Sequence, residues 1–157
     1  MEQYLSMLKD SLLKKEKILI DLLSKSDEQG ELVKKDDVDW ERFGELVDEK
    51  GQLIEELSKL DDGFGLLYER IKEELKNNKD KYASEIKELQ VLIKSVTEKS
   101  TDLQAKEARN KSAIETAFSK TRNEIKQSKM SQKAAMSYYN KMNKINTIDP
   151  QMLDKNC

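Results

Sequence analysis

The feature of this sequence that most restricts its fold is the absence of glycine and proline between Leu66 and Asp149. A packed β fold of that length would need turns, and glycine and proline are the residues that most often form them. The whole chain has five Gly and one Pro, and 38% of its residues are charged. Leu, Lys and Glu, all good helix formers, dominate the composition. The sequence therefore predicts an all-α protein.

The first predicted helix spans residues 2–29. Its leucines recur at alternating steps of three and four residues, which places them on one helix face, and Lys15 occupies the one position that they skip. These leucines are Leu5, Leu8, Leu12, Leu19 and Leu22. Gly30 is predicted to end the helix, because glycine tolerates positive φ at a helix C-terminus.

The second predicted helix spans residues 38–60, and Asp37 or Asp39 is expected to cap its N-terminus. Its apolar seam contains one charged position, Lys50. A chain reversal is predicted at residues 61–65, because two glycines flank Phe64 there and weaken a continuous helix. The heptad phase continues through this stretch, which leaves one bent helix as the alternative.

The third predicted helix spans residues 65–126, with Asn78 as a polar interruption of its seam. It would be about 90 Å long, whereas the first two would be about 40 and 35 Å. Its distal half would therefore protrude, fold back or pair with another chain. The predicted architecture is an antiparallel helical hairpin or three-helix coiled-coil bundle with one very long third helix. Residues 1–126 form the body.

Residues 127–157 are predicted to form a flexible basic tail that becomes helical on a partner. Residues 1–119 carry 21 basic and 28 acidic side chains, a net charge of −7, whereas residues 120–157 carry 8 and 3, a net charge of +5. Serine and asparagine make this tail a weak helix former. Apolar residues nevertheless line up at steps of three and four: Met130, Ala134, Tyr138, Met142 and Ile145.

Catalytic chemistry is disfavoured by the composition. The chain has no His, which removes the commonest general base and metal ligand, and its single Cys cannot form the usual zinc sites. None of the five glycines belongs to a phosphate-binding loop motif. We therefore predict a protein that is not an enzyme and that holds no metal or cofactor.

A cytoplasmic location is expected. The longest apolar runs, such as residues 18–20, are too short to span a bilayer, and the N-terminus lacks the layout of a signal peptide. The single Cys157 has no disulfide partner within the chain.

The basic tail also raises the question of nucleic-acid or membrane binding. Tyr138 and Tyr139 lie among its lysines, and basic residues beside aromatics bind single strands. However, only about one residue in four is basic in the stretch 120–144, and the whole protein is acidic. A membrane-surface helix is disfavoured because the apolar face consists of Met, Ala and Tyr. Neither nucleic acid nor membrane is predicted as a partner.

Residues 39–57 have a recognisable pattern. The sequence DWERFGELVDEKGQLIEEL resembles the D-x₃-h-x₂-L-x₃-K-x₂-L-x₃-L stretch of FlgN-type flagellar export chaperones, where h is hydrophobic. It follows a leucine-rich first helix and precedes a long helical region, as in that family. Residues 107–112 and 138–155 are also similar to clostridial members of the group.

The resemblance implies a function. Such chaperones hold hook-associated proteins, the subunits of the hook–filament junction, soluble and unassembled in the cytoplasm and deliver them to the export gate. Their C-terminal region binds the client, and a tyrosine there contributes to docking at the gate. Tyr138 or Tyr139 would have this role. The FliT-type chaperones of the filament cap share the size and helical plan and remain an alternative.

A partner-binding site is predicted on the C-terminal half of the chain. A methionine-containing helical stripe adapts to varied apolar partners, and client helices dock through anchors at such spacings. The predicted residues are Ile114, Phe118, Met130, Ala134, Tyr138, Tyr139, Met142 and Ile145. The alternative is that these side chains pack on the protein's own body, while Lys50 and Asn78 fix the register of the helices. A structural coiled-coil scaffold is the competing function, and both monomer and homodimer remain open.

Overall fold

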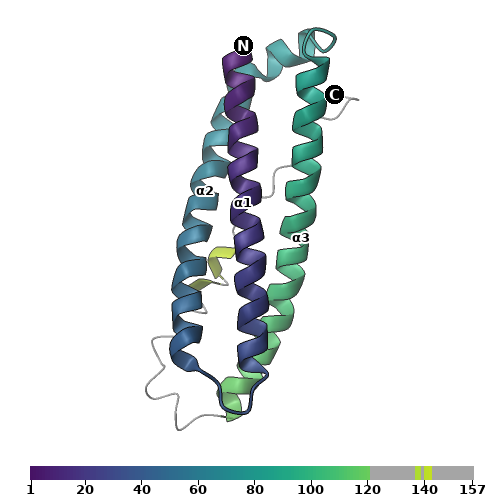
Figure 1. Ribbon diagram of the computed structural model, residues 1–157. Coiled ribbons are helices and arrows are strands. Elements are labelled where there is room, and N and C mark those ends of the chain that lie inside the picture. The colour runs from purple at the N-terminus through teal and green to yellow at the C-terminus, as the bar shows by residue number, and fades with distance from the viewer. Residues whose placement is uncertain (121–136, 139, 143–157) are drawn as a thin grey trace.

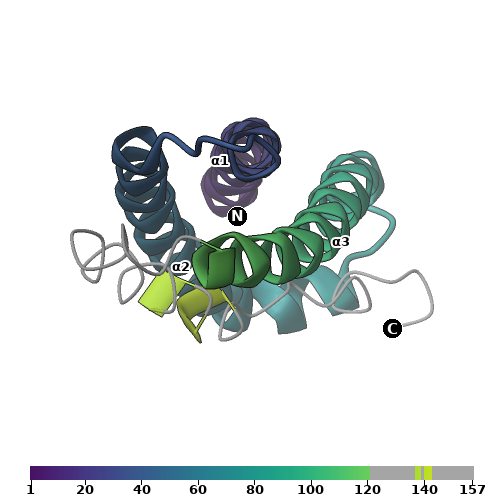
Figure 2. The ribbon, with the colours of Figure 1, turned by 90° about the horizontal axis from the view of Figure 1, so that it is seen from below.

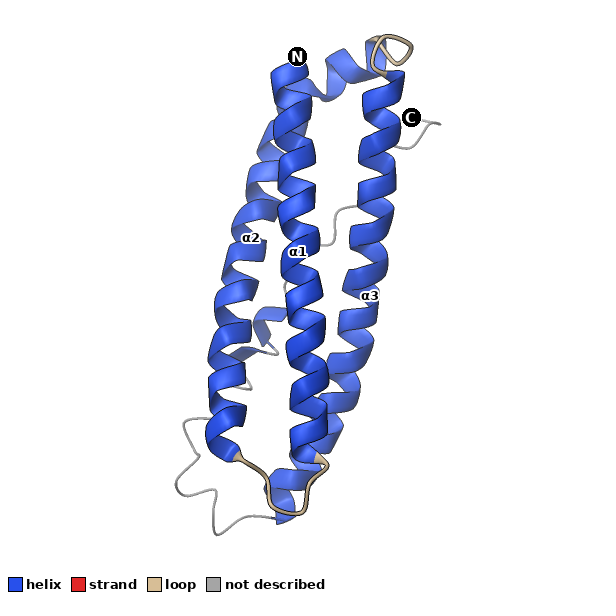
Figure 3. Ribbon diagram, viewed as in Figure 1, coloured by secondary structure: helices blue, strands red, loops and turns tan. Residues whose placement is uncertain are grey.

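The computed structural model describes residues 1–120, 137–138 and 140–142, and residues 1–120 form three helices. The helices are α1 (Glu2–Val33), α2 (Trp40–Asn77) and α3 (Ala83–Lys120). Helix α1 lies between the other two and packs against both (Figures 1 and 2). The described residues contain no strand (Figure 3). The prediction of an all-α fold is confirmed for this part of the chain.

Helix α1 runs antiparallel to α2 and parallel to α3 (Figure 1). Three polar contacts between α1 and α3 share one sequence offset, because each joins residues that are 79 positions apart: Lys9–Glu88, Glu16–Ser95 and Asp27–Lys106. The two parallel helices therefore stay in one register along most of their length.

The core of this three-helix body is a seam of aliphatic and aromatic side chains. Burial of each large apolar side chain contributes about 1.5–3 kcal/mol relative to exposure. The six members with an exposed fraction of 0% are Leu8, Leu12, Leu22, Phe43, Leu46 and Leu57. The alternating leucine spacing of the first helix thus identified its buried face correctly.

The predicted chain reversal at residues 61–65 is wrong. Helix α2 passes through this stretch without interruption, and no residue of the described chain has the positive φ that a glycine turn requires. Phe64 is 2% exposed and continues the seam between Leu57 and Ile71. Tertiary packing of this apolar face outweighs the helix cost of the two glycines. The continuous helix, left open by the heptad phase, is the structure observed.

Replacing Gly63 by alanine is expected to stabilise the protein by about 0.5–1 kcal/mol. A Cβ added at Gly63 meets no atom within 4 Å. Urea unfolding measures the difference. Gly30→Ala is the matched control. Its Cβ would lie 2.8 Å from Asn110 Oδ1, and this close contact is expected to cancel the gain in helix propensity. A lower free energy of unfolding for Gly63→Ala than for the wild type would contradict the helical conformation of residue 63.

The predicted third helix, residues 65–126, is also wrong. The chain reverses after Asn77, and α3 starts at Ala83. Asn78 therefore ends α2, where its side-chain amide donates to the Glu74 carbonyl, and it does not interrupt a seam. Helices α2 and α3 each have 38 described residues, about 57 Å, against 32 residues in α1. No long overhang results within the described residues, and the predicted end at residue 126 lies outside them.

The ends of α1 and α2 differ in how well they were predicted. Helix α1 continues past Gly30 to Val33, because this glycine has an ordinary helical backbone and serves a close approach to α3. Asn110 of α3 occupies that space and donates to the Ser26 carbonyl at 2.7 Å. The predicted cap at Asp39 is confirmed, since its carboxylate accepts from the Arg42 amide at 3.1 Å.

Arg42 joins α1 to α2 near the connection between them. Its guanidinium donates to both carboxylate oxygens of Glu28, at 2.7 and 3.0 Å, and also contacts Glu45 and Glu49. The hydrogen bond from Arg42 holds the pKa of the Glu28 carboxyl below its ordinary value of 4.5. The folded state therefore favours the charged carboxylate.

Glu28→Gln is expected to lower the free energy of unfolding at pH 7 by about 0.2–1 kcal/mol, the range of exposed ion pairs. Because the folded pKa is depressed, this contribution is present above pH 4.5 and is lost as the pH falls through the lower folded value. Urea titrations at pH 7 and pH 3 measure it. A difference between wild type and variant that grows at pH 3 would contradict the assignment.

The predicted division into a body of residues 1–126 and a tail of residues 127–157 falls outside the described residues. Five residues of the tail are described, and they are helical: Ser137, Tyr138, Asn140, Lys141 and Met142. They lie beside α2 (yellow in Figures 1 and 2). We call these five residues the C-terminal segment.

Candidate partner-binding site

A buried ammonium group lies where the three helices meet. Lys50 of α2 is 0% exposed, and its Nζ donates to Gln29 Oε1 of α1 and to Glu107 Oε1 of α3, both at 2.6 Å. The Ser26 hydroxyl of α1 donates to the same carboxylate oxygen of Glu107. Burial lowers the pKa of Lys50, and the carboxylate of Glu107 opposes this effect. These contacts are consistent with the predicted role of Lys50 in fixing helix register.

Tyr138 of the C-terminal segment covers this ammonium group. The centroid of its ring lies 4.3 Å from Lys50 Nζ, within the range of a cation–π interaction. Tyr138 is 3% exposed and Met142 is 5% exposed, so the segment presents one apolar face to the body. A charged side chain in the seam of α2 thus lies directly below an aromatic residue of the predicted partner-binding stripe.

A groove of about 340 Å³ is lined by residues of α2 and of the C-terminal segment. An ion pair between Lys141 Nζ and Glu55 Oε1, 3.2 Å apart, lies at its solvent-exposed side. Gly51 leaves the groove open, since a Cβ added there meets no atom within 4 Å. The residues that line the groove are Val47, Asp48, Gly51, Gln52, Glu55, Ser137, Tyr138 and Lys141.

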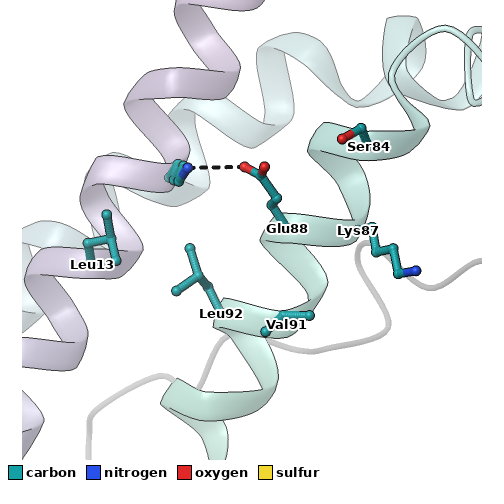
Figure 4. Close-up of a pocket in the computed structure, with 7 residues that line it drawn as sticks. Leu13, Ser84, Lys87, Glu88, Val91 and Leu92 are labelled. Atoms are coloured by element: carbon teal, nitrogen blue, oxygen red, sulfur yellow. Dashed lines mark hydrogen bonds and ion pairs between the residues drawn. The ribbon is translucent and has the colours of Figure 1, made fainter.

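A second groove, of about 360 Å³, lies between α1 and α3 (Figure 4). Leu13 on one side and Val91 on the other are 41% and 62% exposed. The Lys9–Glu88 ion pair, 3.1 Å long, joins the two helices at this groove. The lining combines apolar side chains (Leu13, Val91 and Leu92) with charged ones (Lys9, Lys87 and Glu88).

The residue that interrupted the leucine pattern of α1 is explained by a second buried ion pair. Lys15 is 1% exposed, and its Nζ lies 2.5 Å from Asp61 Oδ1 of α2. Burial raises the pKa of Asp61, against the opposing effect of Lys15. The glycines at positions 63 and 65 predict a turn at Asp61, and a turn residue would not pair with Lys15 in the seam. A lysine inside an aliphatic seam was the one signal for this pairing.

Two of the predicted partner-binding residues, Ile114 and Phe118, lie in the protein's own core. Phe118 stacks on Trp40 of α2 with ring centroids 4.9 Å apart, and its edge-on contact with Phe43 spans 6.0 Å. The exposed fractions of Ile114 and Phe118 are 2% and 7%. In this conformation neither side chain is accessible to a partner.

The remaining predicted residues divide into two groups. The structure places Tyr138 and Met142 together against the body, on the same face of the C-terminal segment. The others lie outside the described residues: Met130, Ala134, Tyr139 and Ile145. The contribution of α2 to this surface, through Val47, Gly51 and Lys50, was not predicted.

In the part of the chain that the structure describes, no three His, Cys, Asp or Glu side chains are grouped so that they could hold a metal ion. None of the helices there combines the length and apolar character that a membrane crossing needs.

Comparisons of the chain with protein-family models, with curated protein sequences and with solved structures find no match.

Proposed function

We propose that this protein is a cytoplasmic flagellar type III export chaperone of the FlgN type, without enzymatic activity. It binds hook-associated proteins, prevents their premature assembly and delivers them to the export gate. The proposal rests on the sequence resemblance of residues 39–57, within α2, to that family. The structural observation that supports it most is the seating of Tyr138 and Met142 as a helical segment on α2.

The mechanism follows from the way that helices bind to grooves. The body already accepts a short amphipathic helical segment beside α2 and leaves a groove of about 340 Å³ next to it. An amphipathic helix of a client subunit would bind in the same way, through apolar side chains at steps of three and four residues. A client helix that is covered in this manner cannot pair with its neighbours in a filament.

The resemblance implies that Tyr138 or Tyr139 docks at the export gate. Tyr138 is 3% exposed and contacts the buried Lys50, so its ring is engaged within the chain. This contact favours Tyr139 as the docking residue in our proposal. Replacing Tyr139 by alanine should reduce export of the client more than replacing Tyr138 by phenylalanine.

A polymerisation assay tests the proposal. Purified hook-associated proteins, and separately the filament cap protein, are followed by light scattering with and without an equimolar amount of this chain. Suppression of scattering for a hook-associated protein is expected. Suppression for the cap protein alone would move the assignment to the FliT type. If neither client is affected and the chain itself forms large assemblies, a coiled-coil scaffold is the better account.

A further inference from the structure

Four segments of the chain meet at the ammonium group of Lys50. Gln29 and Ser26 come from α1, Glu107 comes from α3, and Tyr138 comes from the C-terminal segment. Lys50 itself belongs to α2. The Lys15–Asp61 ion pair, by contrast, joins two segments, α1 and α2.

The ammonium group has three N–H donors. Two of them have defined partners, the Gln29 amide oxygen and the Glu107 carboxylate. The ring of Tyr138, 4.3 Å from Nζ, offers its π face to the same cation. An aliphatic side chain at position 138 would cover the ammonium group equally well. It would not, however, provide the electrostatic attraction that offsets the cost of removing water from the cation.

A second polar contact of the C-terminal segment, between Lys141 and Glu55, is weak by comparison. The side chains of Lys141 and Glu55 are 49% and 62% exposed, and such pairs contribute little in water. Met142 adds apolar burial but no directional contact. The contact between Lys50 and Tyr138 differs from both, because it places an aromatic ring on a fully buried cation.

We propose that the Lys50 ammonium is the anchor that seats the C-terminal segment, and that it selects an aromatic ring at position 138. The polar groups from α1 and α3 keep this cation in place. The inference concerns how the chain holds its own C-terminal residues, and it stands independently of the proposed function.

Amide hydrogen exchange of peptides covering residues 137–142, measured on the full chain, tests the proposal. Tyr138→Phe keeps the ring, whereas Tyr138→Leu keeps only apolar volume. Each is made in the wild-type chain and in a Lys50→Met/Glu107→Leu background. This double replacement removes the cation without leaving an unpaired buried carboxylate, and circular dichroism verifies that the helices remain.

In the wild-type chain we expect protection of the segment in Tyr138→Leu to be at least about tenfold lower than in Tyr138→Phe. In the background without the cation, the two variants are expected to agree within about twofold. Two outcomes would overturn the proposal: equal protection of the two variants in the wild-type chain, or the same ratio in both backgrounds. Either would mean that the segment is held by apolar burial alone.

Discussion

Replacing Glu107 by alanine is expected to lower the free energy of unfolding by about 3–5 kcal/mol, which is the effect of breaking one side of a buried ion pair. Lys50, which is 0% exposed, would lose the carboxylate that stabilises its ammonium group, and the amide oxygen of Gln29 would remain as its hydrogen-bond acceptor. Because globular proteins have only about 5–15 kcal/mol of stability, this is a large fraction of the total. Chemical unfolding monitored by helical circular dichroism at low temperature measures it.

A matched pair of controls separates the buried charge from the loss of packing. Lys50→Met/Glu107→Leu removes both charges and is expected to restore most of the lost stability, since apolar replacements of buried ion pairs are often neutral or stabilising. Glu88→Ala, which breaks the exposed pair with Lys9, is expected to cost less than about 1 kcal/mol. Equal losses of unfolding free energy for Glu107→Ala and Glu88→Ala would contradict the burial of the Lys50–Glu107 ion pair.

Replacing Phe43 by alanine is expected to cost about 3–5 kcal/mol, because the side chain is fully buried and its removal leaves a cavity. Phe43 contacts the rings of Trp40 and Phe118, with centroid distances of 5.2 and 6.0 Å. It therefore supports the junction between the start of α2 and the end of the described part of α3.

Urea unfolding followed by the fluorescence of Trp40, the single tryptophan, reports this change directly. Val91→Ala is the control, since Val91 is 62% exposed and such surface substitutions usually stay within about 0.5 kcal/mol. A loss below about 1 kcal/mol for Phe43→Ala would mean that the aromatic cluster is not part of the packed core.

Helix type and the buried face could be predicted from the sequence, but the position of the second chain reversal could not. The apolar phase of α2 runs through Phe64 to Leu75, and Tyr82 and Leu89 continue it beyond the actual turn. Periodicity therefore gives no boundary there. The glycine signal at residues 63 and 65 pointed to the wrong place, because burial of the seam compensates for a helix cost of about 1 kcal/mol per glycine.

The candidate site was predicted only in part for the same reason. Lys50 was recognised as a charged residue in an apolar seam, and Tyr138 and Met142 were recognised as one stripe. Pairing Lys50 with Glu107 requires the register between α2 and α3, and this register depends on where the chain reverses. The error at residues 61–65 therefore also hid the partners of Lys15 and Lys50.

Titration calorimetry of the full chain against a purified hook-associated protein is the most direct test of the proposed chaperone function. Tight binding with a stoichiometry of one to one is expected. Weaker binding is expected for a chain that ends at Gln127 and lacks the C-terminal segment. No heat of binding to any hook-associated or cap protein would contradict the proposed function.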